Sequence, residues 1–453
     1  MLTHGRQLDW EFDPTEVLQR WPAQCRVVML HSGRYDARWS HRSILAEPVG
    51  YYRFQQGTDG GTSCWAGPSQ AWSSEQWSNR PLVDLRTLLN QGSGLWIGYL
   101  SYDLGRWIEK VPCVADEDHR WPIIELAYCP GYLVYDAVSH SWQAHGTYAS
   151  QGVPEIESND PVCGSFNSAD PVSVFSRGEY EAAVTQVLDF IEAGDVFQVN
   201  LAQRFRAPFE GDYPWAPRAL YQRLSTVSPA WYGGYLELGE QRVIASVSPE
   251  MFLSLDKDGV VTTRPIKGTR PASVSAQDLE QSEKDTAELN MIVDLMRNDL
   301  GRVCDYGSIK ITDARTIESH PTIHHGVATI TGKLHHRKDV VNLLRAAMPG
   351  GSVTGAPKVR AMEIIEEIEP VRRGPYCGCL GFLSPQMSCL NIAIRTMMID
   401  TAESHVDFSV GGGIVADSTP AGEYEETLDK AQALLAALGM GPSVVESGSV
   451  LAV

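Results

Sequence analysis

Residues 260–270 read Val-Val-Thr-Thr-Arg-Pro-Ile-Lys-Gly-Thr-Arg, and they constrain the local fold more than any other stretch of the chain. Val260, Val261 and Thr262 are β-branched and predict a strand. Pro265 cannot donate to a sheet ladder, so the strand ends there or lies at an edge. Lys267 follows, beside Gly268, where the missing Cβ lets the backbone approach a ligand closely.

A lysine at such a strand end has two interpretations. If Lys267 is partly desolvated, its pKa falls and its amine becomes a nucleophile. If it lies in a solvated loop, as most lysines do, it has no chemical role. The stretch alone leaves both open, and the rest of the chain has to decide.

Size and composition narrow the class of protein. At 453 residues the chain exceeds the size of a single core, which predicts two domains or one large elaborated domain. A net charge of −19 argues against a nucleic-acid binder, and it means that local cations or a metal must hold an anionic substrate. Nine cysteines without framework spacing favour a reducing compartment. With no apolar signal core and no run near ~20 apolar residues, we expect a cytoplasmic protein without a membrane span.

Changes in composition divide the chain into four segments. Residues 1–150 have short strand-like runs separated by glycines and predict a β-rich region. Residues 151–176 are dominated by Ser, Asn, Asp, Pro and Gly and predict a linker or surface loop. Residues 177–438 alternate helical and strand patterns and form the predicted catalytic domain. Residues 439–453 are rich in Gly and Ser and predict a flexible tail.

Two charged residues lie in or beside apolar strand patterns. Glu250 precedes Met-Phe-Leu, where burial would raise its pKa toward the range useful for proton transfer. The alternative is a solvated glutamate at a strand end. Arg395 lies inside an apolar run, residues 391–399, that predicts a strand. A buried arginine needs a partner, and a carboxylate ligand is one candidate.

The last predicted helix carries a charged face. Glu423, Glu426 and Lys430 are spaced i, i+3 and i+7, so they share one side of the helix. Carboxylates one turn apart repel each other unless a cation lies between them. Mg²⁺ suits that position because it takes one or two carboxylates and keeps other sites for water and substrate oxygens. An exposed acidic helix is the alternative.

A glycine-rich turn, residues 349–358, opens a helix that we expect to run through Ile368. Backbone N–H groups at such a helix start can bind an anion. The turn lacks the Walker spacing, so it does not indicate a nucleotide site. The glutamates of this stretch predict a solvated helix face; they are Glu363, Glu366, Glu367 and Glu369.

Together these motifs match one known family. The chain resembles the chorismate-utilising enzymes, which include anthranilate synthase component I, aminodeoxychorismate synthase component I, isochorismate synthase and salicylate synthase. The resemblance extends over residues 178–435, and its motifs occur in the family's order. The matching runs are Phe197–Phe205, Ser248–Phe252, Thr263–Arg270, Ala287–Val303, Gly350–Met362, Ile394–Thr396, Gly411–Ser418 and Glu423–Lys430. It implies an α/β (α+β) fold of the anthranilate synthase component I type, with two packed β-sheets and outer helices.

The resemblance also assigns site residues. It implies that Glu250 is a general acid/base and that His325 is an active-site histidine, although the family's residue after the histidine is usually larger than Gly326. It implies that Mg²⁺ is held by Glu288, Glu423 and Glu426. The implied chorismate contacts are Gly268, Thr269, Tyr376, Arg395, Gly411, Gly412, Gly413 and Lys430.

Two positions distinguish members of the family. Members that add water carry a lysine where this chain has Gln198, and glutamine cannot serve as that base, which indicates an ammonia user. Anthranilate synthases have alanine where this chain has Lys267, whereas aminodeoxychorismate synthases have the lysine. The resemblance thus implies covalent addition of Lys267 at C2 of chorismate and amination at C4, giving 4-amino-4-deoxychorismate.

The implied partners follow from the same resemblance. The chain has no Gly-x-Cys-x-Gly elbow for a glutaminase nucleophile. A separate glutamine amidotransferase subunit would supply ammonia, in a pathway toward p-aminobenzoate and folate. The family's tryptophan pocket would fall at Ser32, Pro229, Ala230 and Trp231, so a bound tryptophan is a candidate ligand, while the feedback motif Leu-Leu-Glu-Ser is missing from the sequence.

Two other functions stay open at this point. One is anthranilate synthase, against which Lys267 argues. The other is a catalytically silent chorismate-binding or regulatory subunit, which ranks lower because every candidate catalytic residue is present in the sequence. Consumption of chorismate in the presence of ammonium and Mg²⁺ separates the silent subunit from both enzymes.

Overall fold

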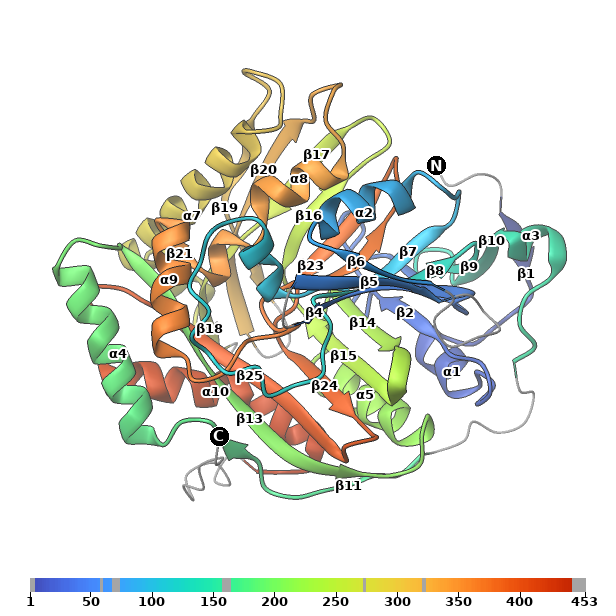
Figure 1. Cartoon of the computed structure of the whole chain (residues 1–453), viewed down its shortest axis with the longest axis horizontal. Helices are drawn as coiled ribbons and strands as arrows, with labels where there is room; N and C mark the ends of the chain where they lie inside the picture. Colours follow the sequence, from blue (N-terminus) through green and yellow to red (C-terminus); the bar gives the residue numbers. More distant parts are fainter. Residues whose placement is uncertain are drawn as a thin grey trace.

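The computed structural model describes residues 5–57, 60–66, 74–156, 164–271, 274–319 and 323–441. Within these ranges the strands form two large antiparallel sheets, with helices packed around them (Figure 1). This is the α+β architecture that the sequence predicted.

The first sheet contains the long strands of the C-terminal part of the chain. In spatial order its strands are β1 (Arg6–Leu8), β10 (Ser141–Gly146), β9 (Gly131–Asp136), β3 (Arg42–Ala46), β2 (Val28–His31), β14 (Tyr232–Glu237), β15 (Arg242–Ser248), β24 (Thr396–Asp400), β25 (His405–Ile414), β13 (Gln198–Glu210) and β11 (Asn167–Ser168). Two short strands also pair with β13, namely β12 (Val172–Ser173) and β21 (Gly355–Ala356).

The second sheet carries the stretch with Lys267 at one end. In spatial order its strands are β18 (Ile266–Pro271), β20 (Ile323–Lys333), β17 (Val260–Arg264), β16 (Met251–Leu255), β23 (Ser388–Ile392), β22 (Cys379–Leu383), β7 (Leu95–Leu100), β8 (Ile124–Cys129), β4 (Gly50–Gly57), β5 (Gly60–Ala66) and β6 (Ser74–Ser78). The remaining strand, β19 (Lys310–Ser319), pairs with β20.

Helices connect and cover these strands. The α-helices are α1 (Pro14–Gln19), α2 (Pro81–Leu89), α3 (Thr147–Gln151), α4 (Arg177–Glu192), α5 (Trp215–Val227), α6 (Ala276–Glu280), α7 (Glu283–Gly301), α8 (Val340–Ala347), α9 (Lys358–Ile368) and α10 (Pro420–Leu438). Short 3₁₀ turns are η1 (Tyr102–Trp107), η2 (Gly239–Gln241) and η3 (Gly351–Val353).

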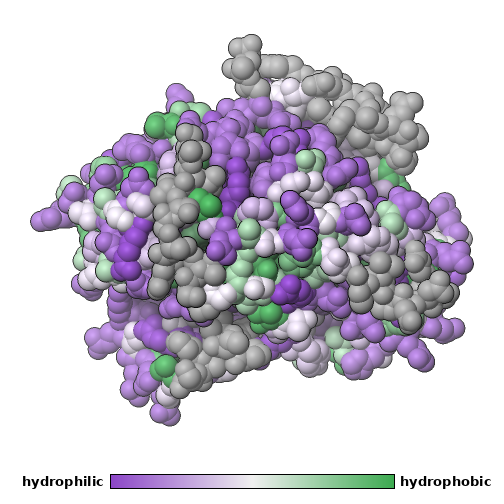
Figure 2. Space-filling view, turned by 90° about the horizontal axis from the view of Figure 1, so that it is seen from below, coloured by the Kyte–Doolittle hydropathy of each residue, from purple (hydrophilic) through white to green (hydrophobic). Residues whose placement is uncertain are grey.

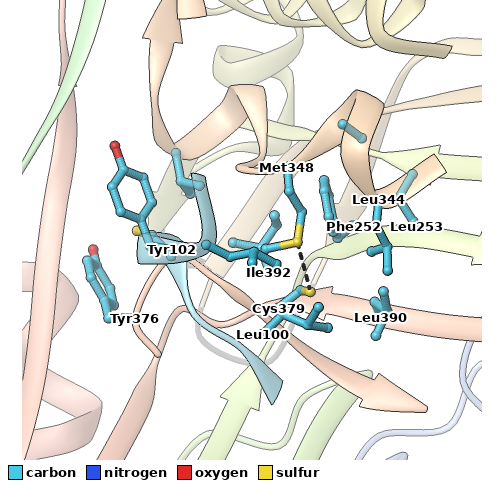
Figure 3. Close-up of a cluster of buried hydrophobic side chains, with 14 of the residues drawn as sticks. Leu100, Tyr102, Phe252, Leu253, Leu344, Met348, Tyr376, Cys379, Leu390 and Ile392 are labelled. Carbon is cyan, nitrogen blue, oxygen red and sulfur yellow. Dashed lines mark hydrogen bonds between the residues drawn. The ribbon is translucent and has the colours of Figure 1, made fainter. Parts of the chain in front are cut away.

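Apolar residues between the sheets hold them together. Ile97 from the second sheet and Ile244 and Met398 from the first are fully buried in one cluster. A second cluster lies between the first sheet and α1, α5 and α10. The largest cluster covers the second sheet under α2, α7 and α8, and Figure 3 shows the part where Met348 meets Cys379, with Tyr376 at its edge.

Local sequence signals explain where two of the helices begin and end. Ser176 and Glu179 form a capping box that starts α4, and Gly194 follows its end with a φ of 82°. The last helix, α10, begins with the N-cap Thr419 and Pro420, and it ends at Gly439, whose φ is 88°. Both helices lie within residues 177–438, where the sequence predicted alternating helices and strands.

Two predictions from the sequence were wrong. The strand predicted over residues 391–399 is interrupted, because Arg395 has a φ of 49° and lies between β23 and β24. Two residues of the face predicted to be solvated are buried in ion pairs. Glu366 pairs with Arg106, and Glu369 lies 2.6 Å from Arg373. Helical periodicity did not reveal either arginine, because Arg106 is distant in sequence and Arg373 lies on the loop after the helix.

In each sheet, a block of strands from residues 1–150 adjoins a block of strands from residues 177–438. The register pairs β2 with β14 and β7 with β22. The functional division between these segments stays a prediction, but both contribute to the same two sheets. Residues 157–163 of the predicted linker and 442–453 of the predicted tail lie outside the described ranges.

The surface is mostly hydrophilic on the face drawn in Figure 2, and hydrophobic residues gather there only in small groups. Scattered exposed apolar residues are ordinary for a folded protein. Among the helices of the described ranges, none combines the length and the apolar character needed to cross a membrane.

Candidate active site

A β-bulge positions Lys267. Ile266 pairs with Val327 and Thr269 pairs with His325, so Lys267 and Gly268 together face the single residue between those partners, Gly326. Gly268 has a φ of 78°, a conformation that glycine adopts without strain. Such bulges are frequent beside active sites, where they redirect a side chain.

Gly326 is required by the same bulge. A Cβ at this position would lie 2.7 Å from the carbonyl oxygen of Lys267, which is closer than real contacts allow. The chain departs here from the larger residue expected at this position of the family. The close approach of the two backbones gives the departure a physical reason.

The ammonium group of Lys267 reaches across to the first sheet. A Cβ built on Gly413 would lie 2.9 Å from Lys267 Nζ and 2.9 Å from Gln198 Nε2, so both side chains meet over this glycine. Burial lowers the pKa of Lys267, while the charge of Glu288 opposes that shift and Lys430 adds to it. The lysine is thus partly desolvated, which is the first of its two interpretations from the sequence, and a larger fraction of it is neutral than in water.

Glu250 lies just before β16 and is 4% exposed. Burial raises its pKa to about 7, although the Ser352 hydroxyl and Lys267 oppose the shift. Ser352 Oγ donates a hydrogen bond of 2.6 Å to Glu250 Oε1. A carboxyl group in this state holds its proton near neutral pH and can donate it to a leaving group.

Three carboxylates face the region between Lys267 and α10. Glu423 Oε2 and Glu426 Oε1 would lie 2.8 and 3.5 Å from a Cβ on Gly412. Burial raises the pKa values of Glu288 and Glu423, and the charge of Glu426 raises both further. Ser418 Oγ donates to Glu423 Oε1 at 2.6 Å, whereas the buried Oε2 has no hydrogen-bond partner.

This donor set fits a hard divalent cation. The ligands are oxygens, one of them is buried and unpaired, and their mutual repulsion would be relieved by positive charge. Within the described ranges, no three His, Cys, Asp or Glu side chains are already gathered as a ligand group. Mg²⁺ needs only one or two protein carboxylates, so Glu423 and Glu426, which both approach Gly412, suffice.

Two cations complete the site. Lys430 Nζ donates to the carbonyl oxygen of Gly411 at 2.7 Å and lies 2.6 Å from Glu426. Burial lowers the pKa of Arg395 to about 10, and it is the only cause of that shift. In the part of the chain that the structure describes, no carboxylate pairs with the Arg395 guanidinium, so an anionic ligand is its natural partner.

The remaining predicted contacts lie around the bulge and the apolar cluster. His325 is 2% exposed, and its Nδ1 lies 2.9 Å from Thr269 Oγ1. Tyr376 is 4% exposed and lies beside Tyr102 at the edge of the apolar cluster (Figure 3). The structure therefore places the predicted histidine on the bulge and the predicted tyrosine at the end of the loop before β22.

The predicted tryptophan pocket also gathers residues from distant segments. Ser32 Oγ donates to the carbonyl oxygen of Arg42 at 2.6 Å, and a Cβ on the next residue, Gly33, would lie 3.4 Å from the backbone of Ala230. Trp231 is 8% exposed. Pro229 adjoins this contact in sequence. Binding of tryptophan here stays a prediction.

Reasoning from the sequence missed two hydroxyls of the site and the bulge. Ser352 donates a hydrogen bond to Glu250, which is distant in sequence. Ser418 donates to Glu423 from an ordinary turn. Gly326 was noted only as an unusually small residue. The glycine-rich turn around Ser352 was the one sequence signal for these contacts, because glycines let the backbone approach other groups closely.

Known proteins of similar sequence identify the family of this chain. The model of the family described as chorismate binding enzyme matches residues 28–436. Aminodeoxychorismate synthase component 1 of Escherichia coli (strain K12) is 38% identical over 433 residues, covering 90% of this chain and 92% of that protein. Anthranilate synthase component 1 of Pseudomonas aeruginosa is 42% identical over 382 residues, covering 77% of this chain and 76% of the relative.

Solved structures show the same fold. Anthranilate synthase component I from Streptococcus pneumoniae TIGR4 superposes with a TM-score of 0.72 at 27% identity, covering 95% of this chain and 99% of that one. The menaquinone-specific isochorismate synthase of Escherichia coli gives a TM-score of 0.70 at 16% identity, covering 95% of this chain and 92% of the other, and shares the fold alone.

The chain therefore belongs to the chorismate binding enzyme family and is a chorismate-utilising enzyme. Within the family it is similar both to aminodeoxychorismate synthase and to anthranilate synthase components.

Proposed function

We propose that the chain is component 1 of an aminodeoxychorismate synthase and converts chorismate and ammonia to 4-amino-4-deoxychorismate. Relatives with the two aminating activities are similarly identical to it, so identity does not separate them. The observation that carries the proposal is the position of Lys267, whose desolvated amine meets Gln198 over Gly413.

In the first half of the reaction, the neutral amine of Lys267 attacks C2 of chorismate. The new C–N bond shifts the ring double bonds and breaks the C4–O bond. Glu250 gives its proton to the departing hydroxyl, which leaves as water. The raised pKa of Glu250 supports this step because the group still carries the proton near neutral pH.

In the second half, ammonia attacks C4 and the double bonds shift back. The bond between C2 and Lys267 breaks, and the lysine leaves as the neutral amine with which it began. Glu250 takes a proton from the new ammonium group and regains its starting state. The sum is chorismate plus ammonia giving the C4 amine plus water, so the atoms and protons balance.

We propose Mg²⁺ as the cofactor, held by Glu423 and Glu426 with Glu288 opposite. When bound, it would neutralise these carboxylates and polarise the carboxylate at C1 of the substrate. The cationic side chains of Arg395 and Lys430 would hold the substrate's two carboxylates. The unpaired guanidinium of Arg395 supports the first of these contacts.

We also propose a glutamine amidotransferase subunit as the source of ammonia, in a pathway toward p-aminobenzoate and folate. Three similar relatives, in Escherichia coli, Klebsiella aerogenes and Salmonella typhimurium, are called component 1, which supports a second component. Stimulation of amination by glutamine only in the presence of such a subunit would test this part.

The function is tested by identifying the product. The purified chain is mixed with chorismate, Mg²⁺ and ammonium without a partner, and the product is analysed by mass and fluorescence. A non-fluorescent amine that a lyase converts to p-aminobenzoate is the expected result. Fluorescent anthranilate would show amination at C2 and overturn the proposal, and unchanged chorismate would favour a silent or partner-dependent subunit.

A further inference from the structure

One face of strands β13 and β25 carries a row of buried polar and small residues that leads away from Lys267. Its cross-strand pairs, in order, are Asn200–Gly413, Ala202–Gly411 and Arg204–Ser409. Paired residues in an antiparallel sheet point to the same face. Because a Cβ on Gly413 would lie 2.9 Å from Lys267 Nζ, this is the face turned toward the lysine. We name these six residues the β13–β25 row.

Polar groups along this face are buried without hydrogen-bond partners. Gln198, next on the same face of β13, is fully buried, and neither its Oε1 nor its Nε2 is paired. The same holds for Nδ2 of Asn200, which is 7% exposed, and for Nε and Nη1 of Arg204, which is 3% exposed. Each such group destabilises the fold if nothing satisfies it. Small polar molecules are therefore expected beside them.

The far end of the row opens into a hollow. Ala202, Arg204 and Ser409 line it together with Tyr376, and its cavity volume of about 10 Å³ is close to the smallest that holds one water-sized molecule. Arg204 Nη2 donates to Asp118, whose side chain is 24% exposed, so the outer end reaches the surface. Ala202, at the inner end, is two residues from Asn200, or roughly 7 Å along the strand.

Hydrogen bonding selects what can travel along this face. The guanidinium of Arg204 lies at its outer end, and the Nε and Nη1 atoms have no hydrogen-bond partner among the described residues. Such N–H donors bond the lone pair of neutral ammonia, which resembles water in size and in hydrogen bonding, but they cannot bond ammonium, which has no lone pair to accept a hydrogen bond. Ammonia is also the form that can attack a carbon atom, because the lone pair of ammonium is already bonded to a proton.

We infer that the β13–β25 row is the path by which ammonia reaches the site, from the hollow at Arg204 to Lys267. This inference rests on the proposed function. The unpaired amides of Gln198 and Asn200 guide the molecule by exchanging hydrogen bonds with it. The small residues of the row, Ala202, Gly411 and Gly413, keep the space open.

The test separates the kinetics of ammonia from those of chorismate. Ala202→Leu fills the path, and Asn200→Leu removes an amide while keeping its branched shape. We expect kcat/KM for ammonia to fall about tenfold or more in Ala202→Leu and severalfold in Asn200→Leu. The KM for chorismate and the rate at saturating ammonium should stay within about twofold. Ala436→Leu, on an exposed position of α10, is the control and should change nothing.

The outcomes distinguish this inference from the proposed function. If the wild type aminates chorismate but both variants keep its kcat/KM for ammonia, the path is wrong and the function stands. A parallel loss for ammonia and chorismate would also overturn the path, because it would indicate general damage to the site. If wild-type turnover does not depend on ammonium, the proposed function fails, and the path fails with it. Should Ala202→Leu not fold, Asn200→Leu still decides the question.

Discussion

Buried charged groups are paired to different extents in two regions of this molecule. Between the sheets, Glu125 is fully buried but lies 2.9 Å from Arg53 and 3.0 Å from Arg242. Burial acts to raise the pKa of Glu125, yet the two arginines outweigh it and hold the pKa below its usual value. The carboxylate therefore stays ionised and fully paired.

Around Lys267 the buried groups are left incompletely paired. Burial dominates here, since it raises the pKa of Glu250 to about 7 and lowers that of Lys267. Gln198 has no hydrogen-bond partner for either side-chain atom. The difference indicates that the carboxylate with a structural role is paired within the chain, whereas the groups of the site are left for a substrate, a metal ion or ammonia.

Replacing Lys267 by Ala should have the largest effect. If this amine is the nucleophile, amination at C4 should fall on the order of 10⁴-fold, with anthranilate appearing in its place. Product analysis by mass and fluorescence measures both. Lys257→Ala, at an exposed lysine, should behave like the wild type. Formation of the C4 amine at the wild-type rate by Lys267→Ala would rule out covalent catalysis.

The variant Glu250→Gln should lose on the order of 10²- to 10⁴-fold in rate. The raised pKa keeps the wild-type group protonated up to about pH 7, so one inflection of the pH–rate profile should lie near that value. Rates are compared at a fixed concentration of neutral ammonia. The inflection should vanish from the residual activity of the variant, and its persistence would assign it to another group.

Arg218→Met tests the paired region. This arginine is fully buried 2.8 Å from Glu237, so its removal should lower the free energy of unfolding by about 3–5 kcal/mol. Denaturant unfolding measures the loss, and the KM for chorismate should stay unchanged. Combining Arg218→Met with Glu237→Leu should restore most of the stability. The exposed pair of Arg297 with Asp294 is the control, where Arg297→Met should cost about 0–1 kcal/mol.

Gly326→Ala should have the smallest effect. Its Cβ would collide with the carbonyl oxygen of Lys267 and shift the bulge, so we expect kcat to fall about tenfold with little change in KM. Gly178→Ala has nothing within 4 Å of the added Cβ and serves as the control. A Gly326→Ala variant with unchanged kcat would show that the bulge tolerates the collision without displacing the lysine.

Periodic segments of the fold could be predicted from the sequence. The helices α4 and α10 carry both an apolar stripe and capping residues, and the strand before Pro265 ends where proline requires it. Arg395 was misplaced in a strand because its apolar neighbours do not reveal a φ of 49°. Burial of Glu366 was missed because its partner Arg106 is 260 residues away.

The features of the candidate site also divide into those that a local sequence pattern predicts and those that it does not. Lys267, Glu250 and the glutamates of α10 could be singled out because each combines a chemical group with a local pattern. The bulge against Gly326 and the hydrogen bond from Ser352 depend on a pairing register and on contacts between distant segments. Single-sequence patterns carry no information on either.

The most direct test of the account is to look for the covalent bond at Lys267. The chain is mixed with chorismate and Mg²⁺ in the absence of ammonia, quenched, and examined by intact-mass and peptide mass spectrometry. The account predicts a mass increase equal to chorismate minus water, located on the peptide that contains Lys267 and missing from Lys267→Ala. An unmodified chain that still aminates chorismate at C4 when ammonia is added, under conditions that preserve a control amine adduct, would contradict it.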